Sequence, residues 1–223
     1  MSNWLKRLAL VLFVAGNVVT YVQAAPKTVT FPTADGAVVD ADLYGQGTRG
    51  VVFAHGAIFN KQSWAPLAQR IAALGYRALA INFRGYGKSH GGNANALDQD
   101  VLAAVRWMHA QGIHSVSVVG GSMGGGASGE AATEARPGEI DKLVLLSPMP
   151  ITHPEQLKAK SILYIASRDE GLAPTVRQQF ARAPQPKQLV LLNGRAHAQN
   201  IFATAQAQQL SDTIVQFLTG KKK

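Results

Sequence analysis

The sequence contains no cysteine. This absence excludes disulfide bonds, a cysteine-linked lipid anchor, thiol catalysis and cysteine-ligated metal sites. The sequence also lacks a His-Glu-x-x-His segment or any other close set of metal ligands, so we expect neither a catalytic metal nor another cofactor. No internal repeat, low-complexity linker or break in composition interrupts residues 25–223. We therefore expect a single domain over those residues.

Acidic residues are scarce relative to basic ones. The chain has 22 Lys and Arg against 13 Asp and Glu, which gives a formal net charge of +9. A basic balance can indicate a nucleic-acid partner, but here the basic residues are scattered, apart from the three lysines at residues 221–223. The pattern predicts a solvated surface and no nucleic-acid binding.

Residues 1–24 have the pattern of a signal peptide. Lys6 and Arg7 precede an apolar run over residues 8–19, and the small-residue segment ending at Ala24 is typical of a cleavage site. We expect the protein to be exported to the periplasm or secreted. The mature chain would begin at Ala25 and have no stable membrane span. The alternative is an uncleaved N-terminal membrane anchor.

Short apolar runs alternate with segments of helical periodicity along the rest of the chain. Strands are expected near residues 29–31, 38–43, 51–54, 78–82, 116–120, 143–146, 162–166 and 189–192, and helices near residues 63–74, 97–109, 122–135, 176–183 and 203–218. The Asp35-Gly36 turn predicts a hairpin between the first two strands. Continuously apolar strands separated by helices predict a doubly wound α/β fold, in which helices cover both faces of a mostly parallel sheet.

A glycine-rich turn follows the strand expected at residues 116–120. Its Gly-x-Ser-x-Gly core runs from Gly120 to Gly124, with Ser122 at the apex. Small neighbours allow the strained backbone that lifts a serine hydroxyl out of a strand-to-helix turn.

An alternative for this segment is a dinucleotide-binding loop, because Gly124, Gly126 and Gly129 fit Gly-x-Gly-x-x-Gly. That match begins four residues after the expected strand. The next strand ends in Ser147 and Pro148, and not in the acidic residue that would bind a ribose. The sequence therefore favours a turn that exposes Ser122 over a dinucleotide-binding loop.

Reactive or oxyanion-binding groups follow four of the expected strands. Ala57, Ser122, Asp169 and His197 each come after a strand, and functional groups gather at the carboxyl ends of strands in such sheets. The chain order Ser, Asp, His is that of one serine-hydrolase architecture.

Five segments in register resemble the α/β-hydrolase superfamily. They are HGAIF at residues 55–59, INFRGYGKSHG at 81–91, GGSMGG at 120–125, IASRDEGLAP at 165–174 and NGRAHA at 193–198. The resemblance is to small serine hydrolases of the esterase or dienelactone-hydrolase-like type, and no segment is long enough for a large lid domain. It implies an eight-stranded, mostly parallel sheet in a three-layer sandwich, with an antiparallel second strand. It also implies Ser122 as nucleophile, His197 as general base and acid, and Asp169 as the acidic member.

The chemistry of these residue types agrees with those roles. A serine hydroxyl becomes nucleophilic when an imidazole takes its proton, and a carboxylate on the other ring nitrogen fixes the tautomer. The backbone N–H groups of Met123 and Ala57 are the candidate oxyanion donors. Glu170 is the alternative acidic member, and we expect His55 to hold the turn at Ala57 by side-chain hydrogen bonds.

These observations predict a serine hydrolase that cleaves an ester, thioester or related acyl bond of a small-molecule substrate. A peptidase or lactonase of the same fold, and a non-catalytic binding protein that retains it, are the alternatives. Several apolar residues are expected near the strand ends that carry the reactive groups and are candidates for an acyl-binding pocket: Ile58, Phe59, Trp64, Met149 and Leu172.

Overall fold

The computed structural model describes residues 25–220, so the predicted signal peptide at residues 1–24 lies outside the described residues. The strands are β1 (Lys27–Pro32), β2 (Val38–Tyr44), β3 (Arg49–Ala54), β4 (Tyr76–Ile81), β5 (Ser115–Gly121), β6 (Ile140–Leu146), β7 (Ala159–Ser167) and β8 (Lys187–Leu192). The α-helices are α1 (Ala65–Ala73), α2 (Leu97–Ala110), α3 (Met123–Glu134), α4 (Ala173–Arg182) and α5 (Ala207–Thr219), and three short 3-10 helices are η1 (Lys61–Trp64), η2 (Pro154–Gln156) and η3 (Ala198–Ala203).

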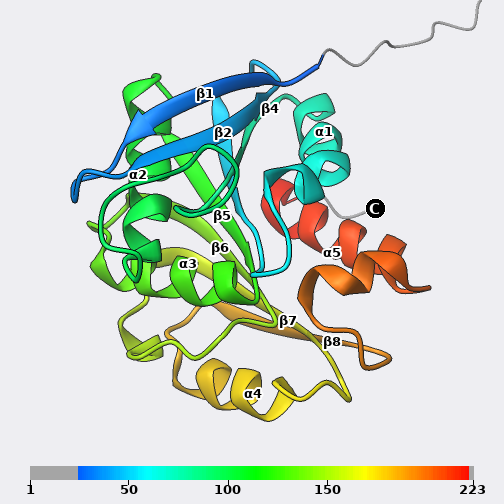
Figure 1. Ribbon diagram of the computed structural model, residues 1–223. Helices are drawn as coiled ribbons and strands as arrows, with labels where there is room; N and C mark the ends of the chain where they lie inside the picture. The colour runs from blue at the N-terminus through cyan, green and yellow to red at the C-terminus, as the bar shows by residue number, and fades with distance from the viewer. Residues whose placement is uncertain (1–24, 221–223) are drawn as a thin grey trace, which may run out of the picture.

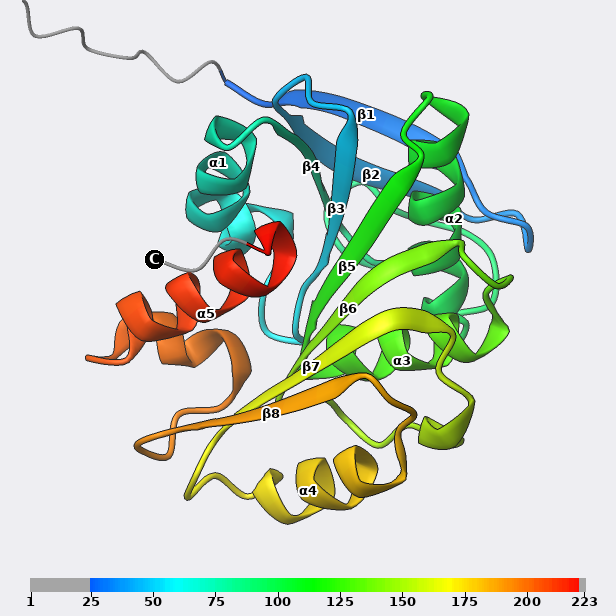
Figure 2. The same ribbon diagram turned by 180° about the vertical axis from the view of Figure 1, so that it is seen from behind.

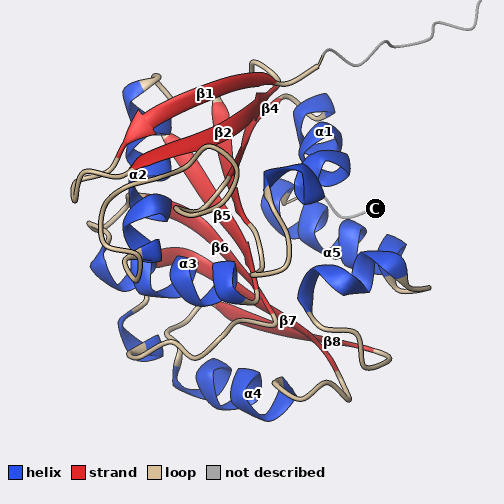
Figure 3. Cartoon of the chain, in the orientation of Figure 1, coloured by secondary structure: helices blue, strands red, loops and turns tan. Residues whose placement is uncertain are grey.

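The eight strands form one sheet in the order β1-β2-β4-β3-β5-β6-β7-β8. Strand β2 is antiparallel to both of its neighbours, β1 and β4, and the strands from β4 to β8 are parallel to one another. Helices lie on both sides of the sheet (Figure 3). The predicted α/β class, the eight strands and the antiparallel second strand are confirmed.

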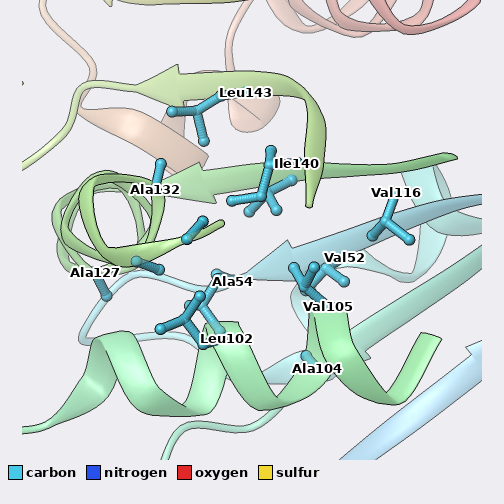
Figure 4. Packing of buried hydrophobic residues seen from close by; sticks show 14 of the residues in the cluster. Val52, Ala54, Leu102, Ala104, Val105, Val116, Ala127, Ala132, Ile140 and Leu143 are labelled. Atoms are coloured by element: carbon cyan, nitrogen blue, oxygen red, sulfur yellow. The ribbon is translucent and has the colours of Figure 1, made fainter. Parts of the chain in front are cut away.

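Helices α2, α3 and α4 cover one face of the sheet, and α1 and α5 cover the other (Figures 1 and 2). On the first face, Leu102 and Val105 of α2 are buried in one hydrophobic cluster with Val52 and Ala54 of β3 (Figure 4). A second cluster joins α1 and α5 to the opposite face. Because both faces are buried, the central strands are apolar at nearly every position.

The loop between β4 and α2 is fixed by a buried guanidinium. The side chain of Arg84 donates hydrogen bonds to Asp100 at the start of α2 and to Asp35 in the β1–β2 turn. Arg84 is 4% exposed and Asp100 is fully buried. This loop therefore has a structural role.

Candidate functional site

Ser122 lies between the end of β5 and the first residue of α3, with φ 54° and ψ −115°. A non-glycine residue in this region is strained, and such strain persists where the surrounding structure holds it. Here the backbone of the turn packs closely against neighbouring backbone at two glycines, Gly120 and Gly124. A Cβ on Gly120 would lie 2.7 Å from the carbonyl carbon of Gly124, and one on Gly124 would lie 2.6 Å from the backbone oxygen of His55. Glycine is therefore required on both sides of the serine.

His197 lies in the segment that follows β8, and its imidazole faces Ser122. Its Nε2 lies 2.8 Å from the Oγ of Ser122, and its Nδ1 lies 2.5 Å from the Oε2 of Glu170. A carboxylate only accepts, so Nδ1 carries the proton and Nε2 is free to accept the serine hydroxyl. The three side chains come from the ends of β5, β7 and β8 and form one hydrogen-bonded chain.

Glu170, and not Asp169, is the acidic partner of His197, so the prediction of Asp169 is wrong. Asp169 is exposed, and its N–H donates to the backbone oxygen of Gly194. Glu170 is 6% exposed. The chain turns after β7, and the N–H of Ser167 donates to Oε1 of Glu170 at 2.9 Å, which directs that longer side chain back toward the strand ends. The turn therefore carries the second of the two adjacent carboxylates to the histidine.

Ser147, which the sequence did not single out, fixes this carboxylate further. It follows β6 with φ 44°, is fully buried, and donates from Oγ to Oε1 of Glu170 at 2.5 Å. The same Oγ accepts the N–H of Ala198 at 3.1 Å. Ser147 thus connects the acidic side chain to the segment that follows His197. A polar residue at a strand end was the only sequence signal for it.

His55 holds the turn between β3 and η1. Its Nε2 accepts the N–H of Phe83 at 3.2 Å, so Nδ1 carries the proton and donates to the backbone oxygen of Gly56 at 2.9 Å. The ring is fully buried, and burial lowers the pKa of His55 below its usual value, which keeps the ring neutral. The predicted structural role of His55 is confirmed.

Both candidate oxyanion donors belong to segments next to Ser122. Met123 is the first residue of α3, where N–H groups have no carbonyl partner within the helix. Ala57 follows Gly56, and a Cβ on Gly56 would lie 3.4 Å from the Cβ of Ser122. The hydroxyl of Tyr86 donates to the backbone oxygen of Ala57 at 2.8 Å. The turn at Ala57 is thus fixed beside the serine.

The candidate acyl-pocket residues fall into three groups by exposure. Ile58 is 80% exposed and Met149 is 44% exposed, and the N–H of Met149 donates to the backbone oxygen of Ser122. Phe59 and Leu172 are half-buried. Trp64 is fully buried against Phe53 and Phe202, so it belongs to the core and does not line a surface pocket.

The glycines of the alternative dinucleotide motif lie inside α3 and not in a loop before it. A Cβ on Gly126 would lie 3.0 Å from the Cβ of Met149, and one on Gly129 would meet the side chain of Ile151. These glycines let α3 pack closely against the segment after β6. That packing accounts for the motif without a nucleotide.

Among residues 25–220, no group of three or more histidine, aspartate or glutamate side chains is placed to hold a metal ion. Within the same part of the chain, no helix combines the length and the hydropathy that a membrane crossing requires.

Solved structures similar to this chain include three enzymes described as hydrolases. A Pyrococcus furiosus esterase matches with a TM-score of 0.75 and 18% identity over 87% of this chain and 90% of that one. A predicted CIB-like hydrolase from Thermoplasma acidophilum matches with a TM-score of 0.70 and 17% identity over 88% and 99%. A dienelactone hydrolase from Anabaena variabilis matches with a TM-score of 0.68 and 20% identity over 90% and 100%. At these identities the likeness shows the fold.

The family assignment comes from the sequence. The family model described as "alpha/beta hydrolase fold" matches residues 50–197, a segment that begins in β3 and ends at His197. With Ser122 at the end of β5 and His197 after β8, the chain belongs to the α/β-hydrolase fold family.

Proposed function

We propose that this protein is a serine hydrolase that cleaves a carboxylic ester, or a related thioester, through an acyl-serine intermediate. The observation that carries the proposal is the continuous hydrogen-bonded chain from Ser122 through His197 to Glu170. The esterase-like α/β-hydrolase fold supports hydrolase activity. The chemistry beyond that rests on the geometry of the three side chains.

In the proposed reaction, the Oγ of Ser122 attacks the ester carbonyl while Nε2 of His197 takes the hydroxyl proton. The N–H groups of Ala57 and Met123 donate to the oxyanion of the tetrahedral intermediate. The intermediate collapses when the bond to the alcohol breaks, and His197 returns the proton to the departing oxygen. Water then attacks the acyl-serine with His197 again as base, which releases the acid and restores Ser122. The Glu170 carboxylate stabilises the imidazolium in both halves.

Labelling with a fluorophosphonate probe tests the proposal, because the probe reacts with an activated serine. The protein from Ala25 onward is expected to be labelled and to hydrolyse p-nitrophenyl acetate. Ser122→Ala is expected to lose both properties, and Ser211→Ala, at a half-buried serine of α5, to keep them. Equal labelling of Ser122→Ala and the unaltered protein would exclude the proposed nucleophile. A protein that is neither labelled nor active would favour the non-catalytic alternative.

We also propose that the protein is exported with cleavage after Ala24, on the sequence pattern of residues 1–24. Mass spectrometry of the protein from the periplasm or medium of a bacterial host checks this. A chain that begins at Ala25 is expected, and a chain with an intact N-terminus in the membrane fraction would indicate an anchor instead.

A further inference from the structure

Gln199 lies two residues after His197, in η3, and is 4% exposed. Its Oε1 accepts the N–H of Gly56 at 2.6 Å, and its Nε2 donates to the Oγ of Ser63 at 2.6 Å. Gly56 and Ser63 belong to the segment between β3 and α1, which is far from Gln199 in the sequence. One buried amide therefore joins the segment that carries His197 to the segment that carries Ala57.

The orientation of this amide follows from its partners. The N–H of Gly56 only donates, so it requires the oxygen of the amide. The hydroxyl of Ser63 donates its own proton to the backbone oxygen of Asn60 at 2.5 Å, so it accepts from the amide nitrogen. Both ends of Gln199 are satisfied, as a buried polar group requires.

Gly56 is held on both sides by these contacts. Its N–H donates to Gln199, and its oxygen accepts the Nδ1 proton of His55 and the N–H of Phe59, each at 2.9 Å. That oxygen belongs to the same rigid peptide unit as the N–H of Ala57. Glycine has the greatest backbone freedom of any residue, so these hydrogen bonds are what fix the direction of the Ala57 N–H.

Gln199 also lies against the turn that exposes the serine. A Cβ on Gly121, the residue before Ser122, would lie 3.2 Å from the Oε1 of Gln199. The amide thus touches the turn beside the nucleophile and the turn with the oxyanion donor, and it is two residues from the general base. Among residues 25–220, no other side-chain hydrogen bond joins η3 to the β3–α1 segment.

We propose that Gln199 is a positioning residue, which sets the direction of the Ala57 N–H relative to Ser122 and His197. This inference rests on the proposed serine-hydrolase function. The positioning of this N–H affects mainly the stability of the transition state, because an oxyanion donor binds charge that develops only there. A misplaced donor leaves the binding of the neutral ester nearly unchanged.

Gln199→Met, which keeps the length of the side chain and removes both hydrogen bonds, is expected to lower kcat by about 10 to 100-fold, since a misplacement of about 1 Å can cost 100-fold. The KM is expected to change by less than about three-fold, as the effect is on the transition state. The kcat is calculated per active site, with the number of sites determined by titration with a fluorophosphonate. A smaller folded fraction of the variant then does not lower the measured kcat. Affinity for a trifluoromethyl ketone, which forms an oxyanion on Ser122, is expected to fall with kcat.

Gln199→Glu is the conservative variant. A carboxyl group buried here without a cation is held in its neutral form, so its carbonyl oxygen accepts the Gly56 N–H and its hydroxyl donates to the Oγ of Ser63, as the amide does. Most of kcat is therefore expected to be retained. Gln179→Met is the matched control. Gln179 is 5% exposed, and its Oε1 accepts the N–H of Ile151, so its loss is expected to lower stability but not kcat per site.

An unchanged kcat per site in Gln199→Met, or an equal loss in Gln199→Glu, would overturn the inference and leave the proposed function intact. An unaltered protein that neither labels nor turns over would overturn both. If Gln199→Met does not fold, Ser63→Ala decides the matter, because it removes the outer partner of the amide. A smaller decrease in kcat with the KM retained is then expected, and no decrease would contradict the inference.

Discussion

The carboxylate of Glu170 is held by three donors: the Oγ of Ser147, the N–H of Ser167 and the Nδ1 of His197. Oε1 takes the first two, which leaves Oε2 for the histidine. A carboxylate fixed in this way orients the imidazole with its Nε2 toward Ser122. The orientation of the whole side-chain triad therefore depends on the turn between β7 and α4.

Glu170→Gln is expected to lower kcat/KM for p-nitrophenyl acetate by about 1,000 to 10,000-fold, because an amide does not stabilise the imidazolium and can hold the wrong tautomer of His197. Asp169→Asn is the matched control, since it makes the same change at the exposed adjacent residue, and its kcat/KM is expected to stay within about three-fold of the unaltered protein, as for most surface substitutions. A larger loss in Asp169→Asn than in Glu170→Gln would contradict the assignment.

The sequence placed Ser122 and His197 at strand ends, and the structure brings them within 2.8 Å. It favoured Asp169 over Glu170 by resemblance, and this was wrong because strand-end placement applies equally to two adjacent residues in an irregular turn. The direction of each side chain depends on hydrogen bonds to distant segments, such as that from Ser147. Gln199 has no motif of its own, and its partner Gly56 is 143 residues away.

At the level of elements, the segment from β3 to α1 is anchored at its far end by Lys61. Its Nζ lies 2.9 Å from Oδ1 of both Asp40 and Asp42 in β2, and its N–H donates to Oδ1 of Asn82. Burial alone would lower the pKa of Lys61, but the two aspartates outweigh it and the pKa lies above its usual value. Burial would likewise raise the pKa of Asp40, yet hydrogen bonds from Lys61 and Asn82 keep it below its usual value. The lysine is therefore charged, and it anchors this segment to the sheet.

Lys61→Met is expected to lower the free energy of unfolding by about 3 to 5 kcal/mol, because it leaves two buried carboxylates without their cation. Lys160→Met is the matched control, since Lys160 also pairs with an aspartate at 2.9 Å but its side chain is 68% exposed. The control is expected to change stability by about 0 to 1 kcal/mol. Urea midpoints measured by circular dichroism give both values, and equal midpoints for the two variants would show that the buried cluster contributes no more than a surface pair.

The elements themselves were largely predictable, and the differences have a common cause. The last helix was expected from residue 203 but begins at Ala207, because η3 and a turn precede it. Apolar spacing cannot separate a 3-10 turn such as η3, with its buried Ile201, from the first turn of an α-helix. Strand β7 begins at Ala159, before the expected residue 162, because its first three residues are at least partly exposed and include Lys160 and Ser161, so they carry no continuous apolar signal.

At the level of the whole molecule, the sheet separates two hydrophobic clusters, and each contains one tryptophan. Trp64 is fully buried in the cluster under α1 and α5. Trp107 of α2 packs against the opposite cluster and stacks on Phe31 with ring centroids 5.5 Å apart. The chain from Ala25 onward has no other tryptophan. Two single-tryptophan variants therefore report on the two faces separately.

Trp64→Phe and Trp107→Phe are expected to unfold in urea with fluorescence midpoints that each coincide with the loss of the proposed hydrolysis of p-nitrophenyl acetate. The reason is that Ser122, Glu170 and His197 follow strands that lie between the two layers, so neither layer can separate without disrupting the site. Trp64→Phe should be tolerated, because the indole N–H of Trp64 has no hydrogen-bond partner in the described structure. In Trp64→Phe, a loss of activity at a lower urea concentration than the one at which the Trp107 fluorescence changes would contradict the expectation. That result would show that the layer of α1 and α5 opens independently of the rest of the molecule.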